Sequence, residues 1–258
     1  MPSRLVGKRI ETAVVRHHGL RQPVPRNLPK LLAGATIHRL TRRGKYLLFD
    51  CGKGTLILHL GMSGRLWVVD KATPAEKHDH FDLVLENGTV VRLRDPRRFG
   101  LVLWSKSDPL THPLLADIGP EPFSSDFGGT SLYRATRNRS AAIKLVLMDS
   151  HVVAGVGNIY ANEALFRAGI RPSTPARRLS RARCDALAKK VRETLQDAIG
   201  AGGSSLRDYV GSDGLAGNFQ SQFMVYGRAG QPCQHCGTAI KEIRQGQRAT
   251  FYCPRCQR

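Results

Sequence analysis

Four cysteines near the C-terminus constrain the fold of this chain more than any other feature of its sequence. They form two C-x2-C pairs, Cys233 with Cys236 and Cys253 with Cys256, and sixteen residues separate the pairs. Four thiolates in this pattern can surround one zinc ion tetrahedrally, each sulfur about 2.3 Å from the metal. Because four protein ligands leave no position open for water, we predict one structural Zn2+. Two disulfides or a chance arrangement are the alternative.

The chain is strongly basic. Its 258 residues include 40 Lys and Arg against 20 Asp and Glu, which gives a net charge of +20 and a pI of about 10.4. A globular protein of this charge is expected to bind a polyanion, most often nucleic acid, and a basic surface that only confers solubility is the alternative. The sequence has neither a run of about eighteen apolar residues nor a signal-peptide pattern, so we expect a cytoplasmic protein without a membrane partner. Cys51 and Cys184 are then expected to be buried or inert thiols in a reducing compartment.

The first 120 or so residues have the pattern of strands. Several stretches alternate or combine β-branched and aromatic residues, glycines interrupt them, and Asn87-Gly88 is a typical hairpin turn. Short strands with such punctuation predict a β-sandwich or a barrel. The clearest stretches are 55–69, 80–95 and 99–105.

After a Pro/Gly/Ser-rich stretch at 119–131, which we interpret as a linker, the pattern becomes helical. Apolar residues recur at intervals of three and four over 141–149 and 158–169. A longer amphipathic helix is predicted over 180–202, with Ser180 as its N-cap. The predicted zinc hairpin then closes the chain.

A glycine-punctuated turn, HVVAGVGN, connects the first two predicted helices. Gly155 and Gly157 allow a tight turn, and backbone N–H groups near Asn158 can then face a phosphate. A purely structural turn fits the same residues equally well.

Two further motifs combine apolar and cationic residues at turns. In RDPRRFG, Arg97 and Phe99 are two residues apart and share one face of an extended chain, and HLGMSG places Met62 in a glycine-flanked turn. Apolar wedges beside arginine are used to hold a duplex open and kinked. Core packing of Met62 and Phe99 beside solvated arginines is the alternative.

Two other candidates carry weaker signals. Lys45 ends the basic run RRGK at the start of a strand, where it could bind phosphate, take part in proton transfer or simply be solvated. EKHDH contains His78, which we interpret as a phosphate-binding or surface residue, because the neighbouring His and Asp are too close in sequence to converge on a metal.

Taken in order, HLGMSG, EKHDH, DPRRFG, GVGNIYANEALF, the SDG loop and QRATFYC with its cysteines resemble bacterial formamidopyrimidine-DNA glycosylase, also called DNA-(apurinic or apyrimidinic site) lyase. The resemblance runs from about Leu5 to Arg258. It implies an α+β fold with an N-terminal β-sandwich over 1–120, a helix–two-turn–helix domain over 121–223 and a zinc β-hairpin finger over 224–258. It also implies that DNA lies in a basic cleft between the halves.

The resemblance further implies a monomeric, cytoplasmic bacterial repair enzyme that is associated with the nucleoid when it is bound to DNA. Such an enzyme excises oxidised purines, such as 8-oxoguanine and formamidopyrimidines, from double-stranded DNA and cleaves the abasic strand by β,δ-elimination. Lys45 matches the lysine that contacts the lesion nucleotide and assists β-elimination. Arg248 matches the finger arginine that binds phosphate and assists δ-elimination, and the loop Ser212–Gly214 matches the lid over the flipped base. The implied DNA-binding residues are the gap-filling Met62, Arg97 and Phe99, the DNA contacts His78 and Arg139, and the phosphate ligands Lys144 and Asn158.

One part of the family pattern has no match in this chain. The family begins with Pro-Glu-Leu-Pro-Glu, whose proline amine is the nucleophile and whose first glutamate is the acid/base. Here Ser3 and Arg4 follow Pro2, and the first glutamate is Glu11. About a dozen residues of the pattern are absent, and at about 1.5 Å per helical residue we do not expect Pro2 to occupy the nucleophile's place. We expect the cell to make a longer, active enzyme. The alternatives are a non-catalytic damaged-DNA-binding protein on the same scaffold and a zinc-ribbon protein that binds RNA.

Overall fold

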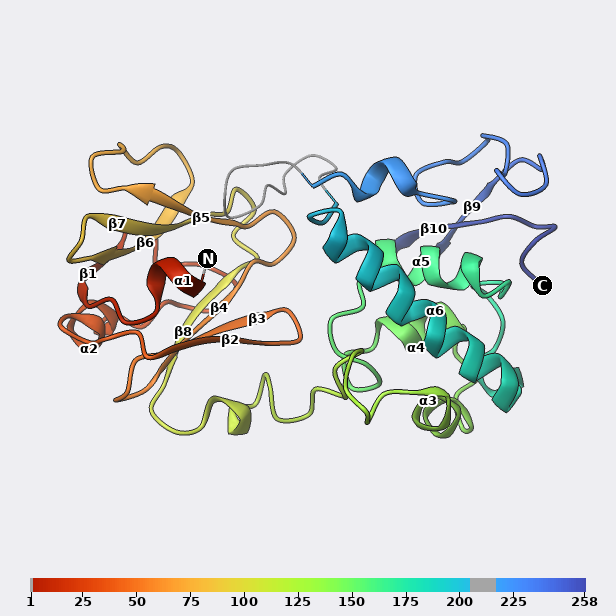
Figure 1. Cartoon of the computed structure of the whole chain (residues 1–258), viewed down its shortest axis with the longest axis horizontal. Coiled ribbons are helices and arrows are strands. Elements are labelled where there is room, and N and C mark those ends of the chain that lie inside the picture. The colour runs from red at the N-terminus through yellow and green to blue at the C-terminus, as the bar shows by residue number, and fades with distance from the viewer. Residues whose placement is uncertain (1, 205–216) are drawn as a thin grey trace. The chain divides into compact units, whose positions relative to one another are not determined.

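The structure, a computed structural model, describes residues 2–204 and 217–258 (Figure 1). The predicted lid residues Ser212–Gly214 lie outside this range. The chain forms two compact units, and the boundary between them falls after Ala116. Among the described helices, none combines the length and the apolar character that crossing a membrane requires.

The first unit is a β-sandwich of two four-stranded antiparallel sheets, as predicted. One sheet has the strand order β1-β6-β7-β5 and the other β2-β3-β4-β8. The strands of the first sheet are β1 (Ile10–Val15), β5 (Arg65–Asp70), β6 (Asp79–Leu85) and β7 (Thr89–Arg94). Those of the second are β2 (Arg39–Arg43), β3 (Tyr46–Asp50), β4 (Thr55–His59) and β8 (Leu101–Ser105). Two short helices, α1 (Pro2–Leu5) and α2 (Leu28–Leu32), and the 3-10 turn η1 (Pro109–Thr111) complete the unit.

Alternation of side chains gives this sandwich its core. Phe49 and Leu56 from one sheet and Phe81 and Leu83 from the other are fully buried in a single cluster. The predicted hairpin at Asn87-Gly88 is confirmed, because β6 and β7 pair on either side of it and Gly88 has a φ of +80°. The stretch 55–69 forms two strands, since a turn separates β4 from β5. These turns leave exposed loops at the sheet ends, where the candidate residues lie.

The second unit contains four α-helices and the zinc hairpin. The helices are α3 (Gly129–Thr136), α4 (Ile143–Met148), α5 (Asn158–Arg167) and α6 (Arg181–Gly200), with 3-10 turns η2 (Ala176–Arg178) and η3 (Phe219–Gln222). The hairpin strands are β9 (Lys241–Gln245) and β10 (Arg248–Tyr252), and β10 packs against α5 (Figure 1). The three predicted helices are confirmed as α4, α5 and α6, and the Ser180 hydroxyl accepts a hydrogen bond from the Arg183 N–H at the start of α6.

The linker predicted at 119–131 is wrong at its end, because α3 already begins at Gly129. Ser131 caps the helix by accepting the Gly128 N–H at 2.9 Å. Gly129 is needed for packing, since a Cβ there would lie 2.5 Å from the Cα of Asp185 in α6. Glycines that suggested flexibility thus serve a close helix–helix contact.

Candidate nucleic-acid interface

The four C-terminal cysteines converge as a zinc site requires. Their sulfur atoms all lie within 4.8 Å of one another. The Cys233 and Cys256 sulfurs are 3.9 Å apart, and those of Cys236 and Cys253 are 3.5 Å apart. Tetrahedral coordination with Zn–S bonds of about 2.3 Å places sulfurs about 3.8 Å apart. The cysteine set therefore fits one structural Zn2+.

The chemistry of the thiols supports the same assignment. Hydrogen bonds from Thr238 lower the pKa of Cys236 to about 6, so this group is a thiolate at neutral pH. Burial, reinforced by the neighbouring sulfurs, raises the pKa of Cys256 to about 12. Four thiols this close cannot all lose their protons unless a cation lies between them, and Zn2+ supplies that charge.

The hairpin presents Arg248 to solvent. Gly246 and Gln247 form the turn between β9 and β10 with φ values of +51° and +60°, the left-handed conformation of a tight hairpin. Arg248 follows as the exposed first residue of β10. The four cysteines lie beyond the opposite end of the hairpin from this turn.

Polar side chains of α4 and α5 hold β10 against these two helices. The Asn162 side-chain oxygen accepts the Phe251 N–H at 2.7 Å, and Asn158 donates to the Ala249 carbonyl at 3.1 Å. The Lys144 ammonium donates to the same carbonyl at 3.0 Å. Each of these bonds joins a helix to β10, the strand that begins at Arg248.

Lys144 itself is fully buried. Its ammonium also donates to the Thr250 hydroxyl at 2.5 Å. Burial, followed by repulsion from Arg248, lowers the pKa of Lys144 to about 8. The structure thus places Lys144 and Asn158 against the hairpin backbone, and their binding of DNA phosphate stays a prediction.

Sequence reasoning missed Glu163, which lies fully buried in α5. Its carboxylate accepts the backbone N–H groups of Met224, Val225 and Tyr226 at 2.9, 3.0 and 2.9 Å. Glu163 therefore ties α5 to the segment that leads into the zinc hairpin. The only signal in the sequence was a carboxylate among the apolar residues of a helix.

In the first unit, the predicted wedge residues lie on two neighbouring loops and are exposed. Met62 is 63% exposed and Phe99 is 42% exposed, so core packing of these two side chains is wrong. The Arg97 guanidinium lies over the Phe99 ring, 4.7 Å from its centre. A Cβ on Gly61 would lie 2.5 Å from the Phe99 carbonyl carbon, so the two loops touch through their backbones.

Lys45 lies in the exposed turn between β2 and β3, near this loop pair. The Tyr46 ring, next in sequence, packs 4.7 Å from the His59 ring. Burial, then the charges of Lys45 and Arg21, lower the pKa of His59 to about 4, which keeps this imidazole neutral beside the lysine. Arg21 also donates its N–H to the Gly100 carbonyl at 3.2 Å. His59 is the first residue of the HLGMSG motif, but sequence analysis assigned no role to it or to Arg21.

The remaining two candidates lie in different units. His78 is in the first unit, has a φ of +74°, and stacks edge-on 6.0 Å from His80. Arg139 is in the second unit, is partly exposed, and forms a 2.6 Å ion pair with Asp149. Burial acts to raise the pKa of Asp149, but hydrogen bonds from Arg139 and His151 outweigh it and hold the pKa below its usual value.

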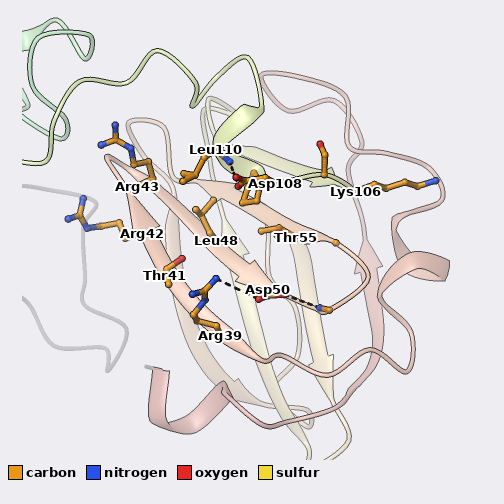
Figure 2. Close-up of a pocket in the computed structure, with 14 residues that line it drawn as sticks. Arg39, Thr41, Arg42, Arg43, Leu48, Asp50, Thr55, Lys106, Asp108 and Leu110 are labelled. Atoms are coloured by element: carbon orange, nitrogen blue, oxygen red, sulfur yellow. Dashed lines mark hydrogen bonds and ion pairs between the residues drawn. The ribbon is translucent and has the colours of Figure 1, made fainter.

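A separate open pocket of about 530 Å³ lies on the outer face of the second sheet. Figure 2 shows Arg39 and Arg43 of β2 and Lys106 at its edge, over a floor that includes Leu48. None of the residues predicted to contact DNA lines this pocket. It adds positive surface to the first unit but is not the candidate site.

An arginine on a metal-held hairpin, in so basic an α+β chain, is typical of zinc-finger proteins that bind nucleic acid. Three family descriptions match the chain: "Formamidopyrimidine-DNA glycosylase N-terminal domain" over 1–102, "Formamidopyrimidine-DNA glycosylase H2TH domain" over 118–210, and "Zinc finger found in FPG and IleRS" over 230–258. The chain therefore belongs to the formamidopyrimidine-DNA glycosylase family.

Individual relatives agree with this placement. The chain is 56% identical to the formamidopyrimidine-DNA glycosylase of Cupriavidus pinatubonensis, with 98% of this chain and 94% of the relative covered. It is 55% identical to that of Methylobacillus flagellatus, with 98% and 91% covered. Among solved structures, the MutM (Fpg) protein of Thermus thermophilus superposes with a TM-score of 0.88 at 37% identity, covering 99% and 93% of the two chains. A Lactococcus lactis Fpg complex with abasic-site DNA gives 0.91 at 35% identity, covering 100% and 95%.

Proposed function

We propose that this protein is a DNA repair glycosylase and abasic-site lyase. It works as a monomer on nucleoid DNA, removes oxidised purines such as 8-oxoguanine and formamidopyrimidines from the duplex, and cleaves the abasic strand by β,δ-elimination. The observation that carries the proposal is identity of about 55% to formamidopyrimidine-DNA glycosylases along nearly the whole chain. Solved complexes of the Lactococcus lactis relative contain abasic-site and Fapy-dG DNA, which supports the same class of ligand.

The wedge loops supply what base extrusion needs. A base within a duplex must leave the stack before its sugar can be attacked, at a cost of a few kcal/mol. Met62 and Phe99 expose apolar surface to water in the free protein. Full burial of an exposed side chain of this kind contributes about 1.5–3 kcal/mol. Because Met62 is 63% and Phe99 is 42% exposed, the two together supply roughly that amount and offset part of the cost of extrusion. Arg97, stacked on Phe99, supplies a hydrogen-bond donor at the same place.

Cations in both units then hold the strand. Arg248 and Arg139 in the second unit and Lys45 in the first are proposed to bind phosphates or the lesion nucleotide, with His78 as a further contact. Phosphate contacts fix the register of a protein on DNA without reading its sequence. Asn158 lies at the start of α5, and its amide is bonded to the hairpin. We propose that it binds a DNA phosphate there.

The chemical step proceeds through an amine nucleophile. The amine attacks C1′ of the extruded nucleotide and displaces the base, which takes up a proton. The C1′–O4′ bond then opens to give a Schiff base, which makes loss of a C2′ proton with the 3′ phosphate, and then of a C4′ proton with the 5′ phosphate, easier. Lys45 assists the first elimination and Arg248 the second. The neutral His59 beside Lys45 keeps its ring nitrogen unprotonated, and that nitrogen accepts the Gly61 N–H at 2.9 Å.

Borohydride trapping tests this proposal. The chain is incubated with a duplex that holds one 8-oxoguanine:C pair, and the matched G:C duplex is the control. A covalent adduct on the lesion strand alone would support the glycosylase and lyase. Binding without any adduct would instead support the non-catalytic damaged-DNA-binding protein, and stronger competition by RNA than by damaged duplex would support the RNA-binding class.

A further inference from the structure

We infer that Asp95 is a positioning residue that locks the two wedge loops into one rigid unit. The wedge loops are residues 60–64, which carry Met62, and residues 96–99, which carry Arg97 and Phe99. The inference rests on the proposed function, because it assigns to Asp95 the task of holding the wedge ready for insertion. Asp95 is not itself proposed to touch DNA.

The carboxylate of Asp95 is bonded to both loops. Asp95 is fully buried. One carboxylate oxygen accepts the Ser63 hydroxyl at 2.7 Å, and the other accepts the Gly100 N–H at 2.7 Å. Its backbone carbonyl accepts the Arg98 N–H at 3.1 Å and lies 3.0 Å from Nε2 of His80. One buried residue therefore closes the second loop upon itself and joins it to the first.

Ser63 extends the connection to the wedge residues themselves. Ser63 is 4% exposed, and its hydroxyl oxygen also accepts the Arg97 N–H at 3.3 Å. Ser63, which follows Met62 in the first loop, is thus bonded to Arg97 of the second loop, and Asp95 orients the Ser63 hydroxyl.

The backbone of Arg98 adds a constraint on the second loop. Its φ is +57°, a left-handed conformation that costs energy for a residue with a side chain. Its guanidinium donates to His17 Nε2 at 2.9 Å, away from the wedge. The backbone carbonyl of Asp95 holds this turn through its bond to the Arg98 N–H, which Asp95→Asn keeps, and Arg97 stacks on Phe99.

Rigidity of the loops matters because ordering flexible loops at the moment of insertion would cost free energy and weaken DNA binding. Loops that are already fixed lose little conformational entropy on binding. An Asp95→Asn variant keeps the size of the side chain but loses its charge. When the amide oxygen accepts the Gly100 N–H, the NH2 group faces Ser63, and the Ser63 hydroxyl must turn from donor to acceptor. We therefore expect the connection between the two loops to weaken and DNA binding at a gap to fall about tenfold.

The test uses a duplex with a stable abasic-site analogue and 2-aminopurine opposite the gap. Fluorescence of 2-aminopurine responds when a side chain enters the stack, and no catalysis is needed. We expect D95N to bind about tenfold more weakly than the wild type and to lose most of the fluorescence change. Ser63→Ala, a smaller perturbation of the same connection, is expected to act in the same direction.

Asp82→Asn is the matched control. Asp82 is also a buried carboxylate of the same unit, but its hydrogen bonds go to Arg16 and Arg92. D82N is expected to keep the wild-type fluorescence change at temperatures where all variants are folded. Equal losses in D95N and D82N would overturn the inference, since they would reflect general destabilisation.

The outcomes separate the inference from the proposed function. If the wild type shows the fluorescence change and both D95N and S63A retain it, the role of Asp95 in joining the two loops is refuted, and the proposed function is not affected. A wild type that binds the duplex without any change would overturn the wedge, and with it both the inference and the proposed excision.

Discussion

Replacement of Glu163 by glutamine tests how the zinc hairpin is held to the helices. The carboxylate now accepts three backbone N–H groups, those of Met224, Val225 and Tyr226. Glutamine has nearly the same shape, but one of its two positions is an NH2 donor, so at least one buried N–H loses its acceptor. A buried donor without a partner costs about 1–3 kcal/mol, and the bonds that remain lose the contribution of the charge. We expect local stability to fall by about 2 kcal/mol.

Hydrogen exchange is the suitable assay, because it reports opening of the three amides directly. A loss of about 2 kcal/mol corresponds to exchange roughly thirtyfold faster in the peptide that contains residues 224–226. Glu193→Gln is the control. Glu193 pairs with Lys190 at 2.7 Å, and both side chains are more than a third exposed, so we expect a change below about 0.5 kcal/mol. Exchange in E163Q within a factor of two of wild type would refute the reasoning.

Three further predictions follow from the hairpin and its surroundings. Cys236→Ser removes one zinc ligand and should lower both zinc content, measured by mass spectrometry, and affinity for abasic duplex; loss of zinc with unchanged affinity would contradict the role of the metal. Arg248→Ala should weaken binding to abasic duplex and reduce the salt dependence by about one phosphate contact, with an unaltered circular dichroism spectrum; an unchanged dissociation constant would contradict it. Burial lowers the pKa of Lys144 to about 8 from an ordinary 10.5, so between these values the unfolded chain holds more protons and stability should rise with pH. Burial raises the pKa of Cys51 to about 11, which acts in the opposite direction in both proteins, so urea unfolding at pH 7.5 and 10 should show the rise as a gain of the wild type relative to Lys144→Met, by up to about 3 kcal/mol.

Features set by short-range patterns could be predicted from the sequence. The spacing of the cysteines alone indicated the zinc site, and Asn87-Gly88 alone indicated a hairpin. The wedge residues could be located by their motifs, but periodicity could not decide whether Met62 and Phe99 were exposed. Their exposure depends on how the two loops meet at Gly61, which no local pattern encodes.

Features set by contacts between distant segments could not be predicted. Lys144 bonds to a hydroxyl 106 residues further along the chain, so its burial depends on the docking of the hairpin. The same holds for Glu163, whose partners lie about sixty residues away. Asp95 was part of a quoted motif, yet its connection to Ser63 across the sheet exists only in the folded chain. Gly129 suggested a linker because a tight helix contact and a flexible segment favour the same residue.

Comparative binding tests the central claim most directly. Zinc-loaded protein is titrated, at one fixed salt concentration, into two duplexes of identical sequence, one intact and one with a single abasic-site analogue. If the wedge and the arginine finger hold an extruded nucleotide, the duplex with the gap binds at least about tenfold more tightly, since no base need be unstacked. Equal dissociation constants for the two duplexes would contradict the account.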